Sequence, residues 1–118
     1  MNPRTWKREE SWWAERYEGK RNPITGRNDI PDVENEELAL EIKMSKTNVS
    51  GEILRKAIEQ SDRASQTTDK LPIVGVSLPG IKREGLKGRP PRERYVFLRE
   101  ELFHTFWKEY LQMGSGLE

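Results

Sequence analysis

Three ionisable residues near the middle of the chain have types and a spacing that suit chemistry: Asp32, Glu41 and Lys43. The segment 38–44 alternates between large apolar residues and other residues, which predicts a strand. One face of this strand is apolar, and Glu41 and Lys43 share the other face. A tight turn at residues 35–36 would lay Asp32 alongside Glu41. The pattern therefore brings two carboxylates and an ammonium group to one place.

Converging carboxylates indicate a cation between them. Two such groups repel each other unless a cation separates them, and hard oxygen ligands suit Mg²⁺ or Mn²⁺. Lys43 at the same point can position or deprotonate a water molecule and stabilise charge that develops on a phosphate. These groups predict metal-dependent hydrolysis of a phosphodiester. The alternative is that Glu41 and Lys43 form an ordinary solvated ion pair.

The first predicted helix, residues 4–18, carries an acidic residue in an unusual position. Glu10 lies within its apolar stripe, where a carboxylate without a partner is costly. Glu10 therefore either points toward the metal site or pairs with a basic neighbour at the edge of the stripe. Glu9 is the second choice for the site because it lies nearer the polar side of the helix. The stripe consists of Trp6, Trp13, Ala14 and Tyr17.

Polar residues near the acidic segment are candidates for accessory roles. Thr25 and Arg27 lie in a turn-rich segment, where they either contact a phosphate or belong to a solvated turn. Glu34 shares the alternation face of Asp32 and is a candidate accessory acid. Lys46 follows the central strand in a polar loop and is a candidate DNA contact.

The apolar periodicity of the chain predicts an α/β fold. A helix between strands of one sheet implies a crossover connection, a mixed sheet and helices on both faces. Gln60 lies at the margin of the second helix's apolar stripe, where it is either an edge amide or an accessory residue. The predicted elements are a helix at 4–18, strands at 21–24, 31–35 and 37–44, a helix at 50–66, strands at 71–78 and 94–98, and a helix at 100–113.

The composition limits the class of protein. The 118 residues suffice for one domain with a modest core, expected at 1–113, and 114–118 are expected to be a cloning linker. The absence of cysteine excludes disulfides and thiolate metal sites and is typical of a reducing, intracellular environment. No apolar run approaches the ~20 residues of a membrane helix. The only histidine, His104, lies among aromatic residues and is interpreted as a structural or surface residue, not as a ligand or general base.

Positive charge is concentrated between the last two predicted strands, although the formal net charge is only +1. A neutral total with one basic zone and one acidic pocket is what a metal-dependent nuclease needs. The Gly- and Pro-rich loop 79–92 is therefore expected to contact phosphates. Its candidate DNA-binding residues are Lys82, Arg83, Lys87, Arg89 and Arg92.

The motif Pro31-Asp32 followed by Glu41-Ile42-Lys43 resembles the PD-(D/E)xK signature of restriction-endonuclease-like nucleases. Within that superfamily the chain is most similar to archaeal and phage-type Holliday junction resolvases, and the similarity covers most of its length. It implies a restriction-endonuclease-like αβββαβ core, with a mixed central β-sheet flanked by helices and an extra C-terminal strand and helix. The loop 79–92 is longer than the plain hairpin expected of that core.

The resemblance also assigns roles to residues. The active site of the family combines an acid from the first helix with the Asp of PD and the Glu and Lys of ExK. These roles fall on Glu10, Asp32, Glu41 and Lys43, with Asp32, Glu41, the Ile42 carbonyl and Glu10 as metal ligands and Thr25 and Gln60 as accessory residues.

The resemblance implies a homodimer that cuts four-way DNA junctions with Mg²⁺, or with Mn²⁺ in its place, inside a prokaryotic or phage-infected cell. The closing helix has a wide aromatic face that suits a dimer interface. One alternative is another nuclease of the same superfamily, of restriction, nicking or flap-cutting type. A second alternative is a DNA-binding protein without catalysis, in which the acidic pocket only contributes to stability.

Overall fold

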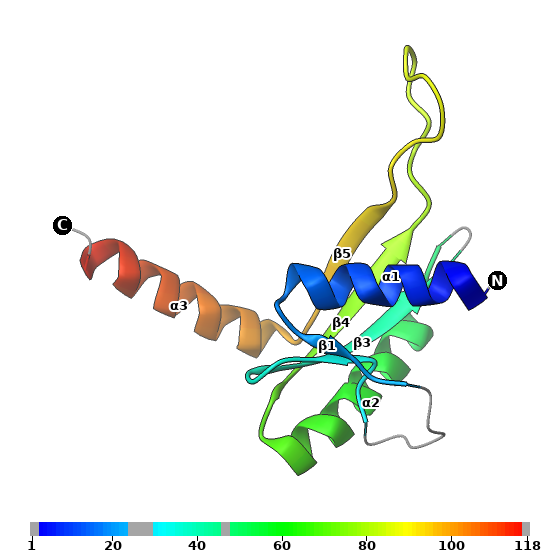
Figure 1. Ribbon diagram of the computed structural model, residues 1–118. Coiled ribbons are helices and arrows are strands. Elements are labelled where there is room, and N and C mark those ends of the chain that lie inside the picture. The colour runs from blue at the N-terminus through cyan, green and yellow to red at the C-terminus, as the bar shows by residue number, and fades with distance from the viewer. Residues whose placement is uncertain (1–2, 24–29, 46–47, 117–118) are drawn as a thin grey trace.

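The fold is α/β, with a five-stranded mixed sheet and three helices, and the predicted order of elements agrees with it. The computed structural model describes residues 3–23, 30–45 and 48–116 (Figure 1). Its elements are α1 (Pro3–Arg16), β1 (Lys20–Arg21), β2 (Val33–Glu34), β3 (Leu38–Met44), α2 (Gly51–Thr68), β4 (Leu71–Leu78), β5 (Glu93–Phe97) and α3 (Glu100–Gly116).

The strands lie in chain order across the sheet, from β1 at one edge to β5 at the other. β3 and β4 are parallel because α2 connects them, whereas the other neighbouring pairs are antiparallel. Helix α2 begins at the predicted N-cap, where the Ser50 hydroxyl accepts a hydrogen bond from the backbone N–H of Ile53 at 3.2 Å. It ends at Asp69, which adopts a left-handed conformation with φ +60°.

The sheet is covered on both faces, as its central strands require. α1 crosses one face and α2 crosses the other (Figure 1). On the α1 face, Trp13 is 1% exposed and packs with Leu40 and Ile42. On the α2 face, Ala57 and Ile58 pack with Val74 and its neighbours. Parallel strands that are buried on both faces lose the simple alternation of core and solvent, which explains why Ala39 and Glu41 are also buried.

Close contact between α1 and the sheet depends on Gly75. A Cβ atom at this position would lie 2.9 Å from Ile42 Cδ1 and 3.0 Å from Trp13 Cη2. A residue without a side chain therefore allows the Trp13 ring to approach β4 closely. The ring is further held by Tyr17, which stacks on it at 5.9 Å between centroids.

The hairpin of β2 and β3 sets the position of the acidic residues. The Asn35 side chain accepts hydrogen bonds from the backbone N–H groups of Glu37 and Leu38, at 2.8 and 2.7 Å. This closes the turn that the sequence predicted at residues 35–36. The strands then pair Val33 with Leu40 and Glu34 with Ala39.

Two parts of the chain extend beyond the compact body. Helix α3 points away from the sheet, and the segment 79–92, here called the basic arm, projects past the ends of β4 and β5 (Figure 1). The radius of gyration is accordingly 15.9 Å, whereas a compact chain of this length would have about 13.5 Å. α3 continues to Gly116, three residues past the predicted end. No helix in the described parts of the chain is long and apolar enough to cross a membrane.

Candidate active site

Asp32 lies where β2 separates from β3. The pairing of the two strands ends at Val33 and Leu40, so the backbone of the following β3 residues is free on that edge. The Asp32 side chain takes the place of a neighbouring strand, because its Oδ2 accepts a hydrogen bond from the Ile42 N–H at 2.8 Å. The N–H and C=O of one strand residue point to the same edge. The Ile42 carbonyl therefore faces the Asp32 side of the strand.

Glu41 and Asp32 meet as the sequence predicted. Their carboxyl groups are hydrogen-bonded to each other, and Glu41 is only 6% exposed. Burial and the negative charge of Asp32 raise the pKa of Glu41 from 4.5 to about 8. Burial also raises the pKa of Asp32, although the Ile42 N–H and Lys43 act against this shift. The pair therefore holds a proton at neutral pH when no cation is bound.

Lys43 lies on the same strand face and belongs to this group. Its positive charge lowers the pKa of both Asp32 and Glu41, which shows that the ammonium group is near both. Its side chain makes no hydrogen bond with the residues that the structure describes. It is therefore available to a water molecule or a phosphate.

Glu10 approaches the same site from α1, and both sequence interpretations of it hold in part. The negative charge of Asp32 contributes to raising the pKa of Glu10, after burial, so the two carboxylates are neighbours. Glu10 also has partners, since Arg21 Nε donates to its Oε1 at 2.6 Å and Trp6 Nε1 donates to its Oε2. Its carboxylate is thus fixed beside the site by an ion pair.

Arg21 is a site residue that the sequence did not identify. Its guanidinium pairs with Glu10 and also lowers the pKa of Asp32. It reaches both acids from β1, which pairs Arg21 with Val33 in the adjacent strand. Because of this register, Arg21 lies beside the residue that follows Asp32, and its guanidinium can reach the two acids. A basic residue at the start of a short strand gives no such signal in the sequence.

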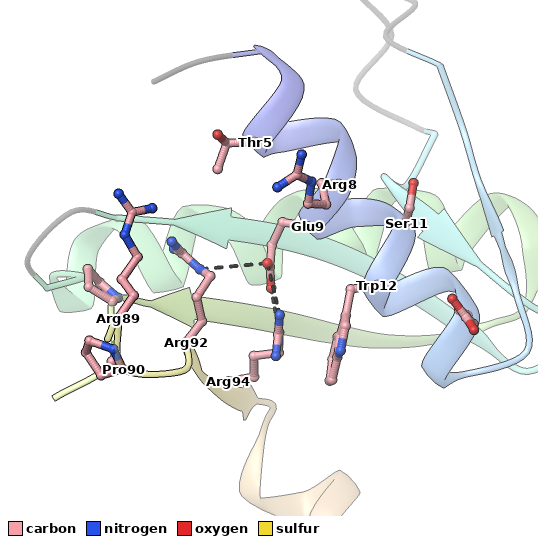
Figure 2. Close-up of a pocket in the computed structure, with 12 residues that line it drawn as sticks. Thr5, Arg8, Glu9, Ser11, Trp12, Arg89, Pro90, Arg92 and Arg94 are labelled. Atoms are coloured by element: carbon pink, nitrogen blue, oxygen red, sulfur yellow. Dashed lines mark hydrogen bonds and ion pairs between the residues drawn. The ribbon is translucent and has the colours of Figure 1, made fainter. Parts of the chain in front are cut away.

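Glu9 does not join this group, which corrects its use as the second choice for the helix acid. It is 4% exposed and therefore not on the polar side of α1. Its carboxylate points toward β5, where Arg94 donates from Nε at 2.6 Å and Arg92 Nε lies at 3.7 Å (Figure 2). Burial alone would raise its pKa, but hydrogen bonds from Arg94 and Ser77 and the arginine charges lower it.

Glu34 shares a strand face with Asp32, as predicted, but it has its own basic partners. Lys70 Nζ lies at 3.3 Å and Lys20 Nζ at 3.6 Å from its Oε1, and Asn22 donates to its Oε2 at 3.1 Å. These partners overcome the effect of burial and lower its pKa. Glu34 therefore connects β1 and β2 with Lys70, which follows α2, and its carboxylate is occupied by these partners.

Gln60, on α2, has a buried side-chain oxygen without a protein partner. Its Oε1 is buried and has no hydrogen-bond partner among the described residues. Buried acceptors without a donor are rare in proteins and call for an explanation. Both interpretations of Gln60, as an edge amide or as an accessory residue, therefore stay predictions, because Trp13 Nε1 in the core also has no partner among the described residues. The other predicted accessory and DNA-binding residues Thr25, Arg27 and Lys46 lie outside the described residues.

The predicted DNA-binding residues of the basic arm differ in their surroundings. Lys82, Arg83, Lys87 and Arg89 are exposed and have no ion-pair partner within the described chain. Arg92, at the base of the arm, is instead half-buried and donates from Nε to the Ser77 hydroxyl at 2.8 Å. Arg92 is thus a structural residue first, which revises its prediction as a free phosphate contact.

The donors at the site fit a hard divalent cation. No group of three or more acidic, histidine or cysteine side chains within metal-binding range occurs in the described residues. The set that is present is two carboxylates, Asp32 and Glu41, with the Ile42 carbonyl on the same edge. Mg²⁺ commonly uses one or two carboxylates and fills its other positions with water and substrate oxygens. A bound cation would also favour the ionised form of Glu41 and so lower its raised pKa.

Comparison with known protein families, with curated proteins and with solved structures found no match to this chain.

Proposed function

We propose that this protein is an Mg²⁺-dependent endonuclease of the PD-(D/E)xK type. The observation that supports this most is the hydrogen-bonded Asp32–Glu41 pair, buried beside Lys43, with the pKa of Glu41 raised to about 8. Two buried carboxylates that meet repel each other unless a cation or a proton lies between them. Such an arrangement is more often found where function requires it.

Each residue of the group has a role in the proposed hydrolysis. Asp32, Glu41 and the Ile42 carbonyl would hold the ion, which when bound polarises the phosphate and lowers the pKa of a water molecule. Lys43 would orient the attacking water and stabilise negative charge on the phosphate. Glu10, held by Arg21, would bind water of the outer shell. The unpaired Gln60 oxygen would accept a hydrogen bond from a water molecule in the site.

The proposed substrate is a four-way DNA junction. The exposed cations of the basic arm would contact phosphates, which gives salt-dependent affinity without reading the sequence. The preference for a junction rests on the resemblance to Holliday junction resolvases. The expected setting is recombination or repair of DNA in a prokaryotic or phage-infected cell.

The proposed partner is a second copy of the chain. On α3, Phe103, Trp107 and Tyr110 are 60%, 48% and 67% exposed, and on β5, Tyr95 and Val96 are about half exposed. β5 is also an edge strand with one unpaired side. Large apolar side chains exposed in this number on a small protein are typical of an interface. A symmetric dimer would place two active sites on one junction.

Cleavage of a labelled immobile junction, beside a linear duplex of the same sequence, tests the proposal. The protein and its Lys43→Ala variant are incubated with each DNA in Mg²⁺ and in EDTA. We expect paired cuts in the junction alone, abolished by EDTA and by the substitution. Equal cutting of the linear duplex would contradict the junction preference and indicate another nuclease of the superfamily. Binding of DNA without any cutting would contradict catalysis and leave a DNA-binding protein.

A further inference from the structure

A cavity of about 730 Å³ lies between α1 and the base of the basic arm, and Glu9 is part of its lining. Glu9 and Glu10 are consecutive in α1, and their side chains reach different groups. Glu10 contacts Arg21 and lies near Asp32, whereas Glu9 contacts Arg94. The cavity and the active site therefore flank the same turn of α1. The volume is within the range of small-ligand sites.

The wall of the cavity is built around buried Glu9. Arg94 donates to Glu9 from Nε at 2.6 Å and from Nη2 at 3.2 Å. Arg92 is fixed by the Ser77 hydroxyl and backbone oxygen, at 2.8 and 3.4 Å, and by Glu9. An arginine has five N–H groups, so each keeps donors for a ligand. Figure 2 shows both side chains directed toward Glu9 beneath α1.

Two further arginines line the cavity without a partner in the described chain. Arg8 comes from α1 and Arg89 from the basic arm, and both are exposed. The complete lining contains four arginines and the glutamates Glu9 and Glu15, which leaves a net charge of +2. This charge favours an anion, and the planar guanidinium groups favour a phosphate.

Trp12 gives the cavity an aromatic surface. The Arg94 guanidinium covers one face of its ring at 3.8 Å from the centroid, and Trp13 meets it edge-on at 5.3 Å. These contacts hold the ring in place while the rest of it lines the cavity. A fixed aromatic ring beside arginines is the combination that binds unpaired bases and their phosphates.

We propose that this cavity binds one unpaired nucleotide of a DNA strand, with the phosphate on Arg8 and Arg89 and the base against Trp12. A base that is paired within a duplex is stacked on both faces and cannot enter a cavity. The inference rests on the proposed nuclease function for its choice of DNA, and it adds a preference for places where strands are unpaired. It also makes Glu9 a positioning residue for Arg94 and Arg92.

Binding of a short labelled oligothymidylate tests the subsite separately from cleavage. Affinity is measured by fluorescence anisotropy in the Lys43→Ala background, for single strands and for the same strand in a duplex. Arg8→Ala is expected to weaken single-strand binding about tenfold, which corresponds to ~1.4 kcal/mol. Duplex binding should change much less. Arg63→Ala is the control, because it removes the same charge from an exposed position on α2.

Tryptophan fluorescence provides a second measurement that does not depend on the arginines. A base against Trp12 should quench emission during the titration, and Trp12→Phe should remove most of that quenching. The subsite would be overturned if Arg8→Ala and Arg63→Ala lowered the affinity for single strands equally. It would also be overturned if Arg8→Ala lowered the affinity for single strand and duplex by the same factor. Selective single-strand binding by a wild-type protein that cuts no DNA would support the subsite while contradicting the nuclease. If the Arg8→Ala protein still cleaved DNA and kept its affinity for single strands, the nuclease would be supported and the subsite contradicted.

Discussion

The chemistry proposed for this protein depends on a few buried charges whose energies are set by their neighbours. Glu41 is 6% exposed and Glu10 is 1% exposed, but Glu10 forms a direct ion pair with Arg21 at 2.6 Å, whereas Lys43 acts on Glu41 only through its nearby charge. Glu41 instead meets a second carboxyl group, Asp32. The difference explains why Glu41 has the larger rise in pKa, to about 8. A bound cation would supply the missing partner.

The first prediction concerns the pH dependence of Glu41. In the unfolded chain it ionises near pH 4.5, but in the folded protein near pH 8. Between these values the folded state holds a proton that unfolding releases, so its stability falls as pH rises through this window. In EDTA, Glu41→Gln should remove this fall, as measured by thermal melting at a series of pH values. Mn²⁺ should stabilise the wild-type protein increasingly as the pH rises, because the ion displaces the proton.

The Glu41→Gln experiment contains its own control, since the variant keeps the shape of the side chain but cannot ionise. Glu59→Gln, on the exposed surface of α2, tests for a general effect of removing a carboxylate. If the melting temperatures of the wild-type and Glu41→Gln proteins changed equally with pH, the raised pKa of Glu41 would be contradicted. If Mn²⁺ stabilised the wild-type and Glu41→Gln proteins equally, the proposed role of Glu41 as a metal ligand would be contradicted.

At this scale the sequence predicted the meeting of Asp32, Glu41 and Lys43 but not their surroundings. Alternation within one strand and a tight turn are local features, and local features can be read from a sequence. Arg21 and Arg94 were missed because their partners depend on strand register and on how α1 crosses the sheet. For the same reason, the sequence could not decide whether Glu9 or Glu10 is the acid that faces the site. Both are buried, and only the position of the helix decides which one faces Asp32.

Among the elements, α1 has the closest connection to the site. It brings Glu10 to Asp32 on one side and Glu9 to β5 on the other. Its position over the sheet is fixed by Trp13, which lies against Gly75. A small displacement of α1 would therefore change both the candidate active site and the cavity beside the basic arm.

The second prediction is that Gly75→Ala destabilises the protein and impairs cleavage together. The added Cβ would lie about 3 Å from Trp13 and Ile42, closer than packed carbon atoms normally approach. Overpacking of this kind costs about 1–3 kcal/mol of folding free energy. Urea unfolding measures the loss, and junction cleavage under conditions where the variant is folded measures the displacement of Glu10.

Gly51→Ala is the matched control for Gly75→Ala. No atom lies within 4 Å of the Cβ that it would add at the start of α2. Replacing glycine by alanine in an open helical position is neutral or stabilises by up to ~1 kcal/mol. If Gly75→Ala behaved like this control, the proposed contact between α1 and β4 would not determine the geometry of the site.

Helix α3 shows where periodicity predicts an element but not its environment. The wide aromatic face of the sequence predicts a helix here, with surface that suits a dimer interface. In the structure only Leu102 and Phe106 pack against the core, and the rest of the stripe is exposed. A hydrophobic pattern is the same whether it packs on its own domain or on another molecule. The sequence could not distinguish these cases because the partner surface lies outside the helix.

For the whole molecule, the third prediction is that α3 and β5 form a symmetric dimer interface. Size-exclusion chromatography with light scattering should give twice the mass of one chain. Trp107→Glu should produce the monomer, because a buried carboxylate without a partner opposes association. Gln112→Glu adds the same charge to an exposed polar position of α3 and should leave the dimer intact. A wild-type monomer at high concentration would contradict this interface.

The central claim is that the Asp32–Glu41 pair holds the metal ion that cleaves DNA, and the single-turnover rate of Asp32→Asn tests it most directly. Asn is nearly isosteric but lacks the charge, so the rate on a junction in Mg²⁺ should fall at least about a hundredfold. Junction binding should remain. Asp62→Asn is the control, since the Asp62 carboxylate of α2 pairs with Arg99 at 2.6 Å and not with the site residues, and it should keep nearly the wild-type rate. Cleavage by Asp32→Asn at the rate of this control would contradict the account.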